Sequence, residues 1–229
     1  GVFMTTDRVN HFLFKDYERD GEYKDDFIEF YQKVDDYIGR LREALPDDVT
    51  MIVASDHGFT SLDYEVPFNE CLREEGWLSF QTDEPEELGD IPTATKAYSF
   101  IPGRFYINLE GREPRGSVPE DEYDEVRDQL KADLEALEGP DGNKVVDRVV
   151  EKEAAFRGDH DDIAPDLVAI PNKGFDLKSG FKGDAEVFDT GPRNGMHSFD
   201  NTSLYIDDPE ATIDDADLFD ITPTILDLM

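Results

Sequence analysis

Residues 49–58 read Val-Thr-Met-Ile-Val-Ala-Ser-Asp-His-Gly, and this stretch decides the fold. Its first six residues form a short, continuous apolar run. Such a run predicts a β-strand that is buried on both faces, as strands of parallel sheets are. Asp56 and His57 follow at the carboxyl end of this strand, which is where open α/β sheets bind their ligands. The stretch therefore predicts both a fold class and a site.

The segments before this strand extend the pattern. Gly1 to Thr5 is apolar and β-branched, which predicts a buried strand. Apolar residues then recur at helical spacing and predict an amphipathic helix closed by Pro46. These residues are Phe27, Phe30, Tyr31, Val34, Tyr37, Ile38, Leu41 and Leu45. Strand, helix and strand in this order predict a βαβ unit, and so an α/β fold with a mostly parallel sheet flanked by helices.

The middle of the chain has a different character. Tyr98 to Leu109 is strand-like and is interrupted by Pro102-Gly103, which predicts a hairpin. A helix with one apolar stripe is expected to open at Pro119, and a strand at 144–150. We interpret residues 80–160 as an inserted α+β cap subdomain between core parts 1–79 and 161–229. Strands at 166–170 and 203–206 and a helix at 221–228 are expected to complete the core.

The charge of the chain is strongly acidic. It holds 56 Asp and Glu against 22 Lys and Arg, a formal net charge of −34, and the acids are spread along the whole sequence. Such a surface keeps a protein soluble in concentrated salt, so we interpret the protein as halophilic; an acidic protein with cationic partners is the alternative. Bare nucleic acid is excluded as a partner because no basic stripe could displace its counterions.

Cysteine content and hydropathy bear on the setting of the protein. The single cysteine, Cys71, allows no internal disulfide and favours the cytoplasm. We expect it to be a small buried residue of a helix around 68–73. No apolar run approaches the roughly 18 residues of a membrane helix, so no membrane partner is expected.

Three of the four histidines lie in short polar motifs, and two of these motifs also contain an aspartate. Asp7 and His11 are four residues apart, so one helical turn would place both toward one ion. Asp56 and His57 are adjacent, and Gly58 permits the sharp turn that their convergence requires. His197 lies in Gly-Met-His-Ser, residues 195–198. Together these five residues predict a metal site of imidazole and carboxylate ligands.

Each motif also has a structural interpretation. A surface Asp and His four apart, a solvated strand-to-loop turn, or a structural loop histidine would each explain one motif alone. His160 lies in a hydrophilic loop, Gly-Asp-His-Asp-Asp, and is expected to be merely solvated, with metal capture by its acidic neighbours as the alternative. Arg193 and Asn194, just before the third motif, could bind a substrate phosphate through charged and amide donors.

The motifs together resemble those of a known family. Thr-Asp-Arg-Val-Asn-His at 6–11, Ser-Asp-His-Gly-Phe at 55–59, Gly-Met-His-Ser-Phe-Asp-Asn at 195–201 and Leu-Phe-Asp-Ile-Thr-Pro-Thr-Ile-Leu at 218–226 are similar to segments of the type I phosphodiesterase/nucleotide pyrophosphatase family. The family belongs to the alkaline phosphatase superfamily, so the resemblance implies an alkaline-phosphatase-like fold. It also implies hydrolysis of a small-molecule phosphodiester or nucleotide substrate.

The resemblance further implies two divalent metal ions, zinc as is usual in this family, with manganese accepted by the same ligand set. Asp7, His11 and His197 would hold one ion, and Asp56 and His57 the other. Family members carry a further Asp and a Thr or Ser nucleophile on an N-terminal segment. We therefore expect this chain to be a C-terminal fragment, with its nucleophile upstream of residue 1 and little activity alone.

Other functions stay open at this stage. Another superfamily activity, phosphomutase or sulfatase, would be distinguished by a preference for monoesters over diesters. A non-catalytic binding domain that kept the fold would lack the upstream Asp and nucleophile.

Overall fold

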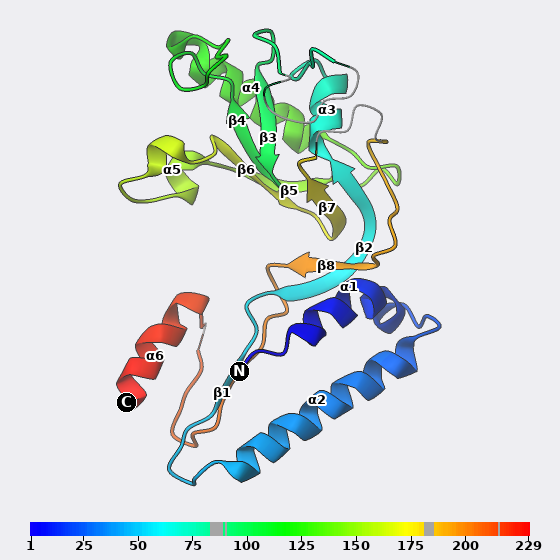
Figure 1. Ribbon diagram of the computed structural model, residues 1–229, viewed down its shortest axis with the longest axis vertical. Helices are drawn as coiled ribbons and strands as arrows, with labels where there is room; N and C mark the ends of the chain where they lie inside the picture. The colour runs from blue at the N-terminus through cyan, green and yellow to red at the C-terminus, as the bar shows by residue number, and fades with distance from the viewer. Residues whose placement is uncertain (83–88, 90, 181–185, 215) are drawn as a thin grey trace. The chain divides into compact units, whose positions relative to one another are not determined.

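The computed structural model of the protein describes residues 1–229 apart from 83–88, 90, 181–185 and 215 (Figure 1). The chain is a mixed α/β protein and forms two compact units, Gly1–Ser61 with Pro192–Met229, and Leu62–Gly191. In the described residues no helix is both long enough and apolar enough to cross a bilayer.

The described residues of the first unit form three α-helices, one 3-10 helix and four strand segments. They are α1 (Met4–Glu18), α2 (Lys24–Ala44), β1 (Ile52–Ala54), the start of β2 (Gly58–Pro67), β8 (Gly195–Ser198), β9 (Leu204–Ile206), η4 (Leu218–Asp220) and α6 (Ile221–Leu228). The second unit holds the rest of β2 and the remaining elements. They are α3 (Phe68–Glu74), β3 (Ala97–Ile101), β4 (Arg104–Ile107), η2 (Glu120–Glu122), α4 (Tyr123–Ala136), β5 (Val146–Glu151), α5 (Lys152–Ala155), η3 (Asp161–Ile163), β6 (Leu167–Pro171) and β7 (Gly174–Lys178).

Aromatic side chains join α1 to α2 in the first unit. The rings of Tyr17 and Phe27 stack with centroids 4.8 Å apart, and Tyr31 lies 4.9 Å from Phe27. The Tyr31 hydroxyl donates to Oδ1 of Asn10, a buried residue of α1, at 2.9 Å. The predicted helix at 27–45 is confirmed as α2, and its apolar stripe meets α1 at Phe27 and Tyr31.

The predicted strand at Gly1 to Thr5 is wrong. Residues 1–3 are exposed and irregular, and α1 begins at Met4. Asp7 lies in the first turn of α1, where a carboxylate is favoured by the helix dipole. The Thr6 hydroxyl also donates to the Phe3 carbonyl at 2.5 Å. These local interactions favour a helix at the start of the chain. A short apolar run forms a strand only where another strand pairs with it.

The prediction of a mostly parallel sheet is also wrong for the described strands. β1 pairs with β9, the first half of β2 with β8, and the β3-β4-β6-β5 sheet is paired throughout, all antiparallel. Only β2 and β7 pair in parallel among the named strands described. The predicted burial of this strand on both faces is wrong as well, because Ile52 and Val53 are only partly buried and Ala54 is exposed. A continuous apolar run also does not indicate the direction of the neighbouring strand. The predicted βαβ unit fails for the same reason, because the partner of β1 is the antiparallel β9.

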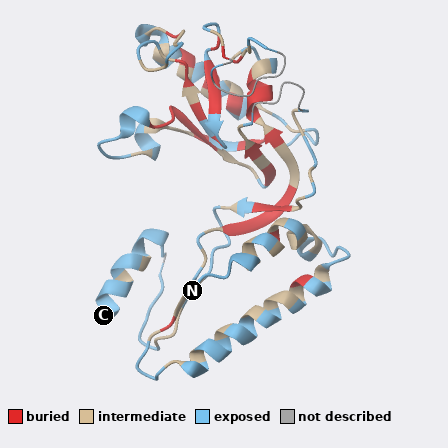
Figure 2. Ribbon diagram, viewed as in Figure 1, coloured by how far each residue is buried: buried red, intermediate tan, exposed pale blue. Residues whose placement is uncertain are grey.

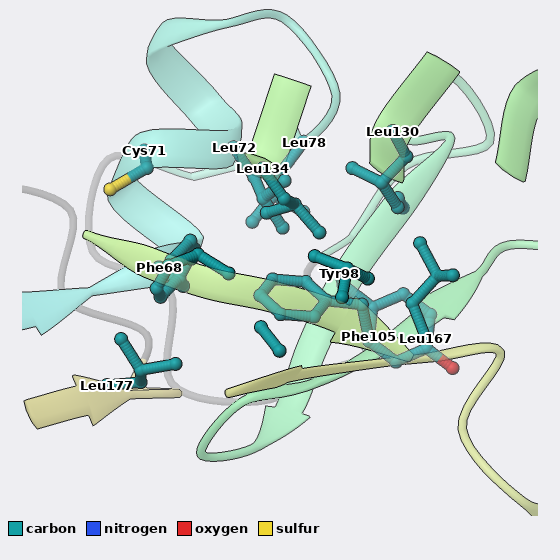
Figure 3. Packing of buried hydrophobic residues seen from close by; sticks show 14 of the residues in the cluster. Phe68, Cys71, Leu72, Leu78, Tyr98, Phe105, Leu130, Leu134, Leu167 and Leu177 are labelled. Atoms are coloured by element: carbon teal, nitrogen blue, oxygen red, sulfur yellow. The ribbon is translucent and has the colours of Figure 1, made fainter. Parts of the chain in front are cut away.

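The second unit carries the larger core. The predicted hairpin is confirmed as β3 and β4, which turn at Gly103 with a φ of +70°. The helix expected from Pro119 is confirmed as η2 and α4, and β5, β6, β9 and α6 lie at their expected positions within a few residues. Figure 3 shows side chains of α3 and α4 packed with residues of the sheet. Figure 2 shows buried residues along the strands of this unit.

Cys71 lies in α3, and its side chain belongs to the core of the second unit (Figure 3). Burial raises the pKa of its thiol to about 12, so the group stays protonated at neutral pH. The expectation of a small buried residue is confirmed. The division of the chain into core parts 1–79 and 161–229 and an inserted subdomain 80–160 stays a prediction. It concerns an insertion in the sequence, whereas the two compact units are defined by which residues pack together.

A buried carboxylate organises the second unit. Asp166 is fully buried and accepts two hydrogen bonds from the Arg112 guanidinium, at 2.7 and 2.6 Å. It also accepts from the Ile107 backbone N–H and the Tyr123 hydroxyl, both at 2.7 Å. Four hydrogen bonds to the two carboxylate oxygens of Asp166 compensate the desolvation of its charge. These bonds connect β4 and α4 to Asp166, the residue before β6.

Removing the arginine should therefore destabilise this unit. We expect Arg112→Ala to lower the free energy of unfolding by about 3–5 kcal/mol, because the Asp166 charge stays buried without its main partner. Denaturant unfolding followed by tryptophan fluorescence measures the change. Arg148→Ala is the control: this exposed arginine pairs with neighbouring Asp147, and its loss should change stability by less than about 1 kcal/mol. Equal effects of the two substitutions would contradict the assignment.

Candidate metal centre

Asp7 and His11 lie one turn apart on α1. The separation of four residues puts both side chains on one face of the helix, with His11 Nε2 at 3.6 Å from Asp7 Oδ1. Both groups are partly covered, with 34% of the Asp7 side chain and 18% of the His11 side chain exposed. The two side chains lie on one face of α1, as the spacing predicts, and their binding of an ion stays a prediction.

His197 reaches the same carboxylate from the other end of the sequence. It lies on β8, which packs against α1 (Figure 1), and its Nε2 is 3.0 Å from Asp7 Oδ1. β8 pairs with β2 in a register that sets His197 opposite Phe59. The ligand atoms of Asp7, His11 and His197 all lie within 4.8 Å of one another, so these three residues could hold a metal ion.

His57, the residue just before β2, is the third histidine of the cluster. Its Nε2 lies 3.9 Å from Asp7 Oδ1 and 3.7 Å from Asp56 Oδ1. Its ring stacks on that of His197, with centroids 3.7 Å apart. One oxygen of Asp7 therefore faces Nε2 atoms of three histidines. Asp56 stands at the outer side of the cluster, with 84% of its side chain exposed.

Backbone carbonyls orient two of the imidazoles. His11 Nδ1 lies 2.9 Å from the Gly195 oxygen, and His57 Nδ1 lies 3.1 Å from the Gly58 oxygen. Because a carbonyl oxygen only accepts, each Nδ1 must carry the hydrogen. In the neutral ring the lone pair is then on Nε2, the nitrogen that faces Asp7. Metal-binding histidines are oriented in this way in proteins generally.

An aromatic ring supports all three histidines. Phe59 is buried, and its ring centroid lies 5.1 Å from those of His11 and His197 and 5.5 Å from that of His57. The plane of the Phe59 ring is nearly perpendicular to the ring planes of His11 and His197, which is a favourable edge-to-face arrangement. The apolar ring thus limits how far these imidazoles can turn away from Asp7.

Partial burial lowers the pKa of His197 from its ordinary value. The neighbouring His57 and His11 rings lower it further, whereas the hydrogen bond to Asp7 opposes the shift. A lowered pKa favours the neutral imidazole at neutral pH, which is the form that binds a metal ion.

Two glycines allow the backbone to approach closely at the cluster. A Cβ on Gly195 would lie 2.1 Å from the Asn10 carbonyl oxygen on α1, far closer than van der Waals contact allows. A Cβ on Gly58 would collide in the same way with the Asp200 carbonyl oxygen. The chain bends at Asp56 and His57, as expected. Gly58 follows with a φ that is not positive, and its lack of a side chain permits the close approach of Asp200.

The remaining expected site residues lie at different places. Asn194 adjoins the cluster, but its side-chain amide contacts α1, donating to Asp16 Oδ2 at 2.8 Å. Arg193 precedes it on the same segment, and a phosphate contact by either residue stays a prediction. His160 is exposed beside η3, as expected for a solvated residue. Sequence reasoning missed Asn10, Phe59 and the Gly195 carbonyl, since none is an imidazole or a carboxylate.

The donor set and its spacing suit a zinc ion. Zinc takes His nitrogen and carboxylate oxygen at 2.0–2.2 Å in a tetrahedron, which places neighbouring ligand atoms about 3.4 Å apart. The separations of 3.0 and 3.6 Å from Asp7 Oδ1 to His197 and His11 bracket this value. Manganese is compatible with the same ligand types.

Comparison with known proteins identifies the family. The family model described as type I phosphodiesterase / nucleotide pyrophosphatase matches residues 1–200, which include all five predicted metal ligands. The chain belongs to this family, which lies within the alkaline phosphatase superfamily. No curated protein and no solved structure matches the chain. The family resemblance found in the sequence motifs is thus confirmed.

The close approach of β8 to α1 can be tested at Gly195. We expect Gly195→Ala to weaken zinc binding about tenfold or more, because the methyl group pushes β8 and His197 away from His11. Calorimetric zinc titration measures the affinity. Gly39→Ala is the control, since a Cβ there meets nothing within 4 Å and α2 gains helix propensity. Unchanged affinity in Gly195→Ala would contradict this account of the centre.

Proposed function

We propose that this chain carries the metal centre of a hydrolase that cleaves phosphodiester or pyrophosphate bonds in small molecules. Membership of the family supports the type of reaction. The single observation that carries the metal dependence is the convergence of His11, His57 and His197 Nε2 on Asp7 Oδ1, at 3.6, 3.9 and 3.0 Å. No thiol takes part, and imidazole with carboxylate is a donor set for zinc or manganese.

The proposed ligands divide between two ions. Asp7, His11 and His197 hold one, and their mutual spacing supports this set. Asp56 and His57 hold the other, together with ligands that the family pattern places before residue 1. The position of His57 Nε2, within 4 Å of both Asp7 and Asp56, supports its place where the two sets meet.

When bound, the ions would lower the pKa of an attacking hydroxyl and balance the charge that develops on the phosphoryl oxygens. The residues of the chain orient the centre. The Gly195 carbonyl holds His11 in the tautomer that offers Nε2. We assign Arg193 to the substrate phosphate, which a planar guanidinium can bind through two hydrogen bonds. The next residue, Asn194, donates its backbone N–H to the His11 carbonyl at 2.8 Å, so Arg193 starts beside the ligands.

The nucleophile in this proposal is a Thr or Ser that the family pattern places before residue 1. Its oxygen attacks phosphorus, the alcohol or phosphate leaving group departs, and water hydrolyses the resulting phosphate ester of the enzyme. The Thr6 hydroxyl is a poor substitute, because it donates to the Phe3 carbonyl and lies next to the ligand Asp7.

The charge of the chain limits the substrate class. A net charge of −34 repels polyanions, which favours small diesters or nucleotides over nucleic acid. The same charge suits concentrated salt, so we propose that the protein works at high ionic strength.

Metal titration tests the ligand set. In molar potassium chloride, which screens the scattered carboxylates, we expect the chain to bind zinc saturably and His197→Ala to lose this binding. His160→Ala is the matched control, because it removes an exposed histidine outside the cluster and should leave affinity unchanged. Zinc binding that survives His197→Ala would contradict the proposed site.

Hydrolysis tests the assignment of the nucleophile. We expect the zinc-loaded 229-residue chain to hydrolyse a chromogenic phosphodiester little or not at all. We expect the protein extended at its N-terminus to hydrolyse this diester in preference to the corresponding phosphate monoester. Rapid diester hydrolysis by the 229 residues would overturn the upstream nucleophile. Preference for a monoester or sulfate ester would favour another superfamily activity, and no hydrolysis by the extended protein would favour a binding domain.

A further inference from the structure

The segment that leads into β8 is fastened to α1 at two places. At the first, Asn194 donates its backbone N–H to the His11 carbonyl at 2.8 Å, and His11 Nδ1 lies 2.9 Å from the Gly195 carbonyl. At the second, the Asn194 side-chain Nδ2 donates to Asp16 Oδ2 at 2.8 Å. His11 and Asp16 are five residues apart, which separates the two places by about 7.5 Å along the helix.

Two attachments constrain β8 more than one can. A strand joined to a helix at a single point can pivot about it, and His197, two residues beyond Gly195, would move with that pivot. A second attachment farther along the helix removes this freedom. His11 and His197 lie 186 positions apart in the sequence, yet their ring centroids are 4.9 Å apart. Their spacing depends on how firmly β8 is held against α1.

Asp16 is itself fixed in place. Its Oδ1 accepts from the Tyr23 backbone N–H at 3.3 Å, within the connection between α1 and α2. Both polar atoms of the Asn194 side chain contact α1. Its Nδ2 donates to Asp16, and its Oδ1 lies 3.5 Å from the Lys15 backbone nitrogen. These bonds orient the Asn194 side chain toward α1.

We propose that Asn194 and Asp16 are positioning residues, whose hydrogen bond sets the spacing of His11 and His197 for the metal ion. The inference rests on the proposed function, because it concerns the ion held by Asp7, His11 and His197. Neither residue is a ligand. Their role is to hold β8 in the place from which His197 reaches Asp7.

Exchanging the two side chains gives a sharp test. Asn194→Asp sets two carboxylates against each other and breaks the attachment. By Coulomb's law alone, the added negative charge near the centre would strengthen cation binding. The proposal predicts the opposite, a loss of zinc affinity of about 10–100-fold, the range seen when groups that orient metal ligands are removed.

The double variant Asn194→Asp with Asp16→Asn should restore the affinity. In it, Asn at position 16 can donate Nδ2 to the new carboxylate while its oxygen still accepts from Tyr23. The new carboxylate can also accept from the Lys15 N–H. The hydrogen bond returns with its polarity reversed, and the net charge equals that of the wild type.

Asn143 provides a matched control in the other compact unit. Its Nδ2 donates to Asp141 Oδ2 at 2.7 Å, an exposed pair with the same chemistry. Asn143→Asp makes the same change of charge and the same carboxylate repulsion. It should leave zinc affinity unchanged.

The experiment combines zinc titration in molar potassium chloride with proton NMR of the metal-free chain. We expect a nuclear Overhauser contact between the His11 and His197 rings in the wild type, its loss in Asn194→Asp, and its return in the double variant together with zinc affinity. If Asn194→Asp keeps both the contact and the affinity, or if the double variant restores neither, the inference is overturned. If the ring contact follows the substitutions while the wild type binds no zinc, the positioning role stands and the proposed function fails.

Discussion

The close approach of β8 to α1 is the constraint on which the proposed metal centre depends. Gly195 allows it, because any side chain at this position would collide with the Asn10 carbonyl. Its own carbonyl then reaches His11 Nδ1 and fixes which nitrogen faces Asp7. His197 follows on the same strand, and the pairing of β8 with β2 brings His57 onto its ring. The contact of β8 with α1 and its pairing with β2 thus bring histidines from three distant segments of the sequence around one carboxylate.

The charge of the protein sets a second constraint. Most of the 56 acidic side chains are exposed and attract cations over the whole surface, so negative charge alone cannot define a site. What distinguishes the cluster is three nitrogen donors beside Asp7, held by the buried ring of Phe59. Salt weakens attraction between exposed charges much more than it weakens coordination by partly covered ligands. A centre built on imidazoles is therefore suited to an acidic protein in concentrated salt.

Local signals in the sequence predicted part of this structure. The helical spacing of Phe27, Tyr31 and their neighbours predicted α2, and Pro102-Gly103 predicted the hairpin, because both depend on adjacent residues. Strand direction could not be predicted, since the partner of β1 lies about 150 residues away. The motifs gave the proposed ligands, but not what orients them: the bond from His11 to Gly195 joins residues 184 positions apart. The buried Asp166 network also joins distant segments and leaves no motif.

X-ray absorption spectroscopy of the chain loaded with one equivalent of zinc tests the central claim most directly, because it reports the ligands of the ion itself. The account predicts a first shell of nitrogen and oxygen at about 2.0–2.1 Å, with the outer-shell scattering of at least two imidazoles. His11 and His197 would supply these rings. A first shell of oxygen without imidazole scattering would place zinc on the acidic surface and contradict the account.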